Sequence, residues 1–195
     1  MNRLLFAFLF LSTIHTYAQT DSLKKVAVHA SYYGGIWVPT NNLSIVGNHP
    51  VAGIQFGIRS TKILLDLTIE FKFLKSKNEY LVFHENMLHA TDHFFGGYFG
   101  LDGGYNFYSK NLNHFDLLVG AGLDGFDALK IDNEVEKSIN SFNYNFGLGY
   151  RRDLGQYTYI GIDLKHNFFS YSNEKGTNLD GYASTFRLKF GINAK

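Results

Sequence analysis

The segment Gly181-Tyr-Ala-Ser-Thr-Phe-Arg-Leu-Lys-Phe-Gly-Ile192 alternates between two kinds of side chain. Its even positions are mostly aromatic or aliphatic, from Tyr182 to Ile192, whereas its odd positions carry Arg187 and Lys189. Successive side chains of a β-strand point to opposite faces of the ribbon. The segment therefore predicts a strand with one apolar face and one charged face.

Eight segments of the chain share this alternation. In the clearest one, Ile63, Leu65 and Leu67 begin an apolar face, while Asp66 and Glu70 lie on the other face. The pattern predicts an all-β chain with eight strands, at residues 26–38, 50–59, 62–73, 93–107, 114–123, 139–151, 156–169 and 181–192.

The connections between these segments alternate in length. Short connections are expected near residues 60–61, 108–113 and 152–155, and long polar ones near 39–49, 74–92, 124–138 and 170–180. An antiparallel up-and-down barrel has this alternation when all its short turns lie at one end. We therefore expect an eight-stranded transmembrane β-barrel with its short turns in the periplasm and its four long loops outside the cell.

The first residues have the pattern of an export signal. Arg3 provides a positive charge, Leu4 to Leu11 is an apolar run, and Thr16-Tyr17-Ala18 is a small-x-small cleavage pattern. The run is much shorter than the roughly 20 apolar residues that span a bilayer. We expect a signal peptide at residues 1–18 and one outer-membrane barrel domain at 19–195, which inserts through its strands.

The overall composition excludes several classes of function. Lys and Arg number 18 and Asp and Glu 17, and this near balance gives no indication of a nucleic-acid partner. The chain has no cysteine, which excludes a disulfide, a catalytic thiolate and a lipid on an N-terminal cysteine. The 20 glycines and the 17% aromatic content are typical of a β-rich chain.

The size of the apolar side chains indicates which face points outward. An eight-stranded barrel has an interior just wide enough for side chains or one small ligand, and the many aromatic rings would overfill it. Glycines on the polar face would make room for long charged side chains, at positions 120, 122, 147, 149 and 161. This favours a transmembrane barrel over the alternative, a soluble periplasmic lipocalin-like carrier.

With the aromatic face outward, charged side chains of both signs point into the barrel. They are Arg59, Asp66, Glu70, Lys72, Asp102, Asp116, Arg151, Asp163, Lys165, Arg187 and Lys189. Because an unpaired buried charge is costly, we expect these side chains to pair with one another as a polar plug. The alternative is a narrow, porin-like ion path.

Two features carry a resemblance to a known family. They are the signal that ends at Tyr17-Ala18-Gln19, and the segment Phe146-Gly-Leu-Gly-Tyr-Arg151 with the strand Tyr159-Ile-Gly-Ile-Asp-Leu164 after it. With the eight-strand plan, they resemble the small outer-membrane barrels of the OmpA/OmpX type. The resemblance implies a monomer in the outer membrane that contacts its lipid, its lipopolysaccharide and the barrel assembly machinery.

A weaker resemblance concerns the segment Ser170-Tyr171-Ser172-Asn173. It is similar to the signature of PagL-type lipid A deacylases, and this resemblance implies a lipid A acyl-ester hydrolase with Ser172 as the nucleophile. The position of the catalytic histidine holds Ser170, however, and His166 lies four residues from Ser170, about 13 Å along a strand. We therefore expect no catalytic residue, and an inactive or active hydrolase remains the alternative.

A histidine-rich stretch lies in the long connection after the third strand. In His84-Glu85-Asn86-Met87-Leu88-His89 the two histidines are one residue too far apart for a zinc-protease motif. His89 and His93 could bind a transition metal together with Asp92 if this stretch were helical. We assign no catalytic, cofactor or metal residue, and expect a non-enzymatic barrel with a structural or surface-interaction role.

Overall fold

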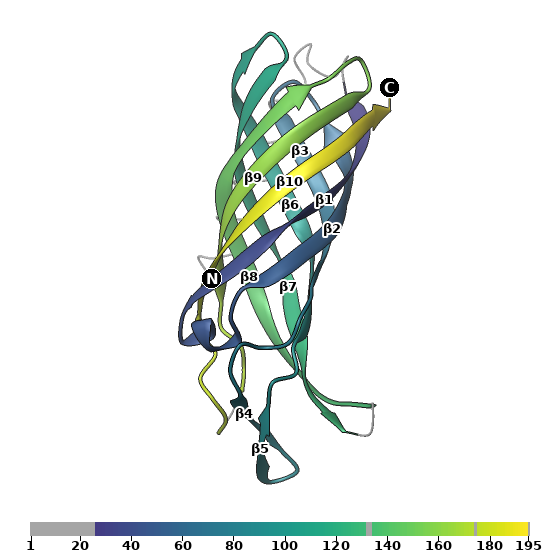
Figure 1. Ribbon diagram of the computed structural model, residues 1–195. Helices are drawn as coiled ribbons and strands as arrows, with labels where there is room; N and C mark the ends of the chain where they lie inside the picture. The colour runs from purple at the N-terminus through teal and green to yellow at the C-terminus, as the bar shows by residue number, and fades with distance from the viewer. Residues whose placement is uncertain (1–25, 132–133, 174, 195) are drawn as a thin grey trace, which may run out of the picture.

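The computed structural model describes residues 26–131, 134–173 and 175–194, and these residues form mainly antiparallel strands (Figure 1). The expected signal peptide at residues 1–18 lies outside the described residues. The elements are β1 (Ala27–Asn41), the 3₁₀ helix η2 (Asn42–Val46), β2 (His49–Arg59), β3 (Ile63–Lys72), β4 (Tyr80–His84), β5 (Met87–Thr91), β6 (Phe95–Lys110), β7 (Asn113–Ile131), β8 (Glu134–Asp153), β9 (Thr158–Phe169) and β10 (Gly181–Ala194).

Eight of the strands close into a barrel in the order β1-β10-β9-β8-β7-β6-β3-β2, while β4 and β5 form a separate two-stranded sheet. All neighbours in the barrel are antiparallel, and the barrel closes where β1 pairs with β10, for example at Tyr32 and Phe190. The predicted eight-stranded up-and-down barrel is confirmed. In the part of the chain that the structure describes, no helix has the length and apolar character needed to cross a membrane.

The two faces of the barrel wall differ as the alternation predicts. Apolar side chains such as Phe99, Leu123 and Phe142 are exposed on the outer surface, while Asp66 and Lys165 are buried inside. A lipocalin-like carrier has the inverse arrangement, with an apolar interior that holds its ligand. The soluble-carrier alternative is therefore wrong for this chain.

Short and long connections lie at opposite ends of the barrel (Figure 1). The short ones cover residues 60–62, 111–112 and 154–157, and the start of β1 lies at this end with the end of β10, where Val28 pairs with Ala194. The hairpin of β4 and β5 and the tip of β7 and β8 project from the other end. We call these the short-turn end and the loop end.

Two of the expected long loops contain strand structure, which corrects the sequence-based assignment. The segment 74–92 folds into the β4–β5 hairpin, in which Tyr80 pairs with Thr91. The segment 124–138 continues β7 and β8, which remain paired as far as Ile131 and Glu134. Side chains of β4 alternate between buried and exposed. Tyr80 and Val82 are buried and hold the hairpin against the loop end of the barrel, while Leu81 is exposed.

Candidate functional site: the lumen and its loop-end cap

Charged side chains from seven strands meet inside the barrel, as the sequence predicts. The buried carboxylates are Asp66, Glu70, Asp102, Asp116, Asp124 and Asp163. The buried cations are Arg59, Lys72, Lys165, Arg187 and Lys189, and Arg151 is partly buried near the end of β8, at the short-turn end. The two signs are nearly balanced, so the interior can neutralise itself by pairing.

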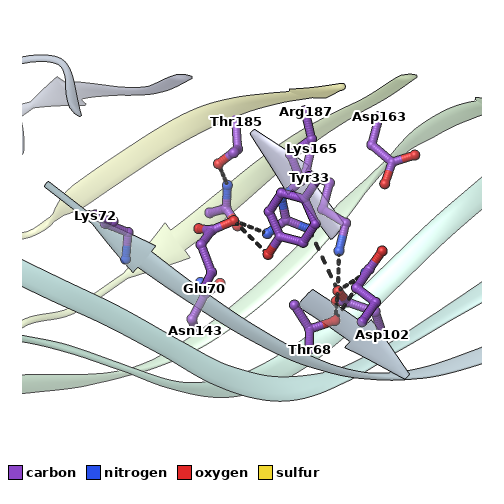
Figure 2. Close-up of polar contacts among 12 residues, drawn as sticks. Tyr33, Thr68, Glu70, Lys72, Asp102, Asn143, Asp163, Lys165, Thr185 and Arg187 are labelled. Atoms are coloured by element: carbon purple, nitrogen blue, oxygen red, sulfur yellow. Dashed lines mark hydrogen bonds and ion pairs between the residues drawn. The ribbon is translucent and has the colours of Figure 1, made fainter. Parts of the chain in front are cut away.

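The middle of the lumen is bridged by Arg187 (Figure 2). Its Nη2 lies 2.6 Å from Glu70 Oε2, and its Nη1 lies 3.7 Å from Asp102 Oδ2. The Tyr33 hydroxyl donates a second hydrogen bond to Glu70, at 3.1 Å. One guanidinium thus connects β10 with β3 through a close ion pair, which belongs to the stronger class of polar interaction, and with β6 through a longer one.

Asp102 accepts contacts from several donor side chains in the middle of the lumen (Figure 2). Lys165 Nζ lies 2.6 Å from its carboxylate, Thr68 donates a hydrogen bond at 2.7 Å, and Gln55 donates another at 3.3 Å. Lys189 and Asp163 form a neighbouring ion pair at 2.7 Å. These contacts join side chains from β2, β3, β6, β9 and β10 across the barrel interior.

Glycines on the inner face give these side chains the space they need. A Cβ atom at Gly120 would collide with Asp102 Oδ1, and one at Gly53 would collide with the Tyr33 ring. Larger residues at these two positions would therefore disrupt the network. The predicted role of inward-facing glycines is confirmed at Gly120.

Toward the short-turn end, Asp66, His29 and Tyr159 form a buried chain. His29 Nε2 lies 2.6 Å from Asp66, and His29 Nδ1 lies 3.1 Å from the Tyr159 hydroxyl. The Arg59 guanidinium lies over the Tyr159 ring, 4.6 Å from its centroid. In this chain a carboxylate contacts a histidine that contacts a hydroxyl, which is the sequence of contacts in a catalytic triad. These three side chains are almost fully buried, however, and this burial favours a structural role.

Toward the loop end, Lys72 and Asp124 connect the polar lumen to an apolar layer. Lys72 Nζ lies 2.5 Å from Asp124 Oδ2, and the Tyr171 hydroxyl donates to Asp124 at 2.5 Å. The ammonium of Lys72 also lies 5.3 Å from the centroid of the Trp37 ring. This side chain therefore contacts both charge and aromatic surface.

An apolar cap covers the lumen at the loop end. It gathers residues from β1, η2, β2, β4, β7, β8, β9, β10 and the connections 92–94 and 170–180, namely Trp37, Leu43, Val46, Val51, Tyr80, Val82, Phe94, Phe126, Ala128, Leu129, Ile139, Phe169, Tyr171, Leu179 and Ala183. Burial raises the pKa of Tyr80, so its hydroxyl stays protonated and donates to the His93 carbonyl at 2.5 Å. This cap is not predicted by the alternation of the strands.

The fold does not bring Ser172 and His166, the candidate residues of the possible hydrolase, into contact. Ser172 is exposed, and its hydroxyl forms no hydrogen bond with the described residues. His166 lies on the outer face of β9, where it stacks on Tyr182 and its Nδ1 lies 3.4 Å from Ser184 Oγ. Asn173 instead donates to the Leu81 carbonyl, which ties the connection 170–180 to β4.

The histidines of the long connection lie on the hairpin and not on a helix. His89 belongs to β5, and His84 Nε2 lies 3.8 Å from Glu136. The helical spacing needed to join His89, Asp92 and His93 is therefore absent. Within residues 26–131, 134–173 and 175–194, no group of three or more His, Asp or Glu residues is placed to hold a metal ion.

The hairpin and its base form an exposed surface at the loop end. Met87 and Leu88 are both more than half exposed near the tip of the hairpin. At its base, Lys75 lies 2.9 Å from Asp92, and this ammonium lowers the pKa of the Asp92 carboxyl. The surface thus combines apolar side chains at its tip with paired charges at its base.

Several solved structures have a similar fold. Neisserial surface protein A (NspA) is 13% identical with a TM-score of 0.60, covering 87% of this chain and 96% of that chain. A major outer membrane protein from Thermus thermophilus is 12% identical with a TM-score of 0.51, covering 86% and 98%. The N-terminal barrel domain of Pseudomonas aeruginosa OprF is 17% identical with a TM-score of 0.50, covering 86% and 96%.

No protein-family model matches the chain, and no curated protein sequence matches it. The likeness is therefore one of fold. The chain has the eight-stranded fold of outer-membrane barrels of the OmpA/OmpX type, as the resemblance predicted.

Proposed function

We propose that the chain is a non-enzymatic outer-membrane protein that is exported with its signal peptide and works as a closed barrel with a structural or surface-interaction role. The outward belt of apolar residues supports insertion in a lipid bilayer, since such a belt would be unfavourable in water. The length of the barrel strands also fits a bilayer, because tilted strands of about 9–11 residues are enough to span a membrane.

The observation that carries the closed-lumen proposal is the combination of paired charges and apolar cap. Arg187, Asp102 and Lys165 cross the middle of the lumen, and Lys72 with Asp124 lies between them and the cap. An ion path needs water along its length, and both layers occupy that space with protein atoms. The proposal therefore favours a plug over a porin-like path.

The surface-interaction role rests on the loop end. Met87, Leu88 and Leu81 present apolar side chains on a hairpin that projects past the barrel wall. Exposed apolar residues on a rigid scaffold are a common feature of interaction sites. The partners proposed for the barrel itself are outer-membrane lipid, lipopolysaccharide and the assembly machinery, and it acts as a monomer.

The test is fractionation of cells that express the full chain, followed by electrophoresis with and without boiling. We expect the protein in the outer-membrane fraction, with a shift in migration on boiling, because folded barrels of this kind resist detergent. A second arm deletes residues 79–92 to remove the hairpin. This variant should keep the shift on boiling, because it retains all eight strands of the barrel. Recovery of the full chain in the soluble periplasm would contradict the proposal.

A further inference from the structure

A groove of about 370 Å³ lies on the outer face of the barrel near the loop end, over β3, β6, β7 and β8. Its wall and floor come from paired positions on these four strands. The groove lies on the lipid-facing side of the wall, whereas the ion network and the apolar cap lie inside the barrel.

The strand register explains why the barrel wall is hollow here. One row of directly paired, outward-facing positions runs through Phe71, Gly97, Gly125 and Asn140. Two neighbouring members of this row are glycines, so the surface lacks two adjacent side chains. The rows on either side are filled, by Phe99, Leu123 and Phe142 on one side and by Phe95, Asp127 and Ser138 on the other.

The polarity of the groove changes along the barrel axis. Toward the middle of the barrel, the exposed rings and chains of Phe99 and Leu123 border it. Toward the loop end it is bordered by Asp127, which accepts a hydrogen bond from Ser138 at 2.9 Å. The Asn140 side chain reaches over the floor, since its Oδ1 occupies the space that a Cβ at Gly125 would need.

These borders fit an amphiphile with one apolar chain and a polar head. The lining contains no Lys or Arg, the side chains that usually pair with phosphate. Asp127 would repel an anionic head group, whereas its carboxylate and the Asn140 amide can bond to hydroxyl groups. The charge of the rim therefore selects a sugar head group over a phosphate.

We infer that this groove binds one acyl chain of a glycolipid, with the sugar hydroxyls at Asp127 and Asn140. The inference rests on the proposed function, because it needs the barrel in the outer membrane with its loop end outward. Ordinary contact with any bilayer lipid, and docking of a second copy of the chain, are the competing outcomes of the test.

The experiment is native mass spectrometry of the folded protein with an equimolar mixture of monoglucosyl diacylglycerol and phosphatidylglycerol that carry the same acyl chains. The test variant is Gly97→Val. A Cβ at Gly97 meets only the Glu70 carbonyl oxygen, at 3.4 Å, so the barrel can accept it while the groove is filled. The matched control is Gly103→Val on the same strand and the same face, outside the groove.

We expect the natural chain to retain the glucolipid in preference to phosphatidylglycerol. Gly97→Val should lower this retention about tenfold, the equivalent of roughly 1.4 kcal/mol, while Gly103→Val should leave it unchanged. Asp127→Lys should shift the preference toward phosphatidylglycerol, since it places a cation at the rim.

Equal retention of the two lipids by the natural chain would overturn the inference, as would equal losses in Gly97→Val and Gly103→Val. A lipid-free dimer that Gly97→Val abolishes would assign the groove to a second copy and would also overturn it. The shift on boiling is measured for every variant. A folded barrel without lipid preference contradicts this inference alone, whereas a chain that never inserts contradicts the proposed function.

Discussion

The guanidinium of Arg187 on β10 lies 2.6 Å from the carboxylate of Glu70 on β3, although β1 and β2 separate these strands in the barrel wall. Both side chains are about 2–3% exposed, so water cannot replace either partner. The pair therefore connects distant parts of the wall through the interior, and each charge depends on the other.

Replacement of Arg187 by Gln should destabilise the barrel by roughly 3–5 kcal/mol, because it leaves Glu70 buried without its partner. The measurement is equilibrium unfolding by urea in lipid vesicles. The double variant Arg187→Gln with Glu70→Gln should recover part of the loss. The control is Arg152→Gln at an exposed position, and equal stability of Arg187→Gln and this control would contradict the assigned role.

The outward face can be tested at Leu67, which points away from the lumen on β3. Leu67→Arg should cost about 2–4 kcal/mol, because it places a charge on the lipid face near the middle of the membrane. The same substitution at Leu81, on the hairpin outside the barrel wall, should have little effect. Unfolding in vesicles measures both variants, and equal tolerance of the two substitutions would contradict the assignment of Leu67 to the lipid face.

The orientation of the barrel can be tested by cysteine labelling, since the chain has no cysteine of its own. Met87 is exposed at the loop end, and Leu112 is exposed in a turn at the short-turn end. A membrane-impermeant maleimide should label Met87→Cys on intact cells and Leu112→Cys only after the cells are broken. The opposite pattern would place the loop end in the periplasm.

Catalysis by Ser172 is expected to be absent, because no described histidine lies within hydrogen-bonding distance of its hydroxyl. Purified, folded protein should leave the acyl chains of lipid A intact, and Ser172→Ala should change neither lipid A composition nor stability by much. Mass spectrometry of lipid A gives the readout. A loss of acyl chains that depends on Ser172 would establish the hydrolase instead.

The strands and their facing could be predicted from sequence because both follow from a local period of two. Asp66 and Glu70 alternate with Leu65, Leu67 and Ile69, and a barrel wall has only two sides. A charge at every second position of a transmembrane strand must therefore face the interior. The same reasoning identified Arg187, Lys165 and Asp102 as neighbours in one lumen, although it could not pair them.

The cap could not be predicted in the same way because its residues follow no period. Leu43, Val46 and Leu179 are isolated apolar residues in polar connections, and their partners lie far away in the sequence. Near residues 127–130 the pairing of β7 with β8 shifts register, so Ala128 and Leu129 are both buried. Because of this irregularity, the period of two is lost there, and the sequence did not predict that β7 and β8 extend past the expected strand ends.

The alternation of Tyr80 and Val82 was a usable signal for the β4–β5 hairpin. This alternation extends over a single short strand, and the many polar residues around it led to the prediction of a loop. The groove over Gly97 and Gly125 depends on register between strands, which the sequence pattern alone does not specify.

The most direct test of the closed lumen is the conductance of the purified, folded protein in a planar lipid bilayer. Ion pairs around Arg187 and Asp102 and the apolar cap above Lys72 should block the passage of ions. We predict insertion without stable unit steps of current for the natural chain. The same result is expected for the variant that lacks residues 79–92, because it loses Tyr80 and Val82 from the cap but keeps the ion pairs of the lumen. Reproducible unit conductance steps from the natural chain would show an open path through the barrel and would contradict the closed-lumen account.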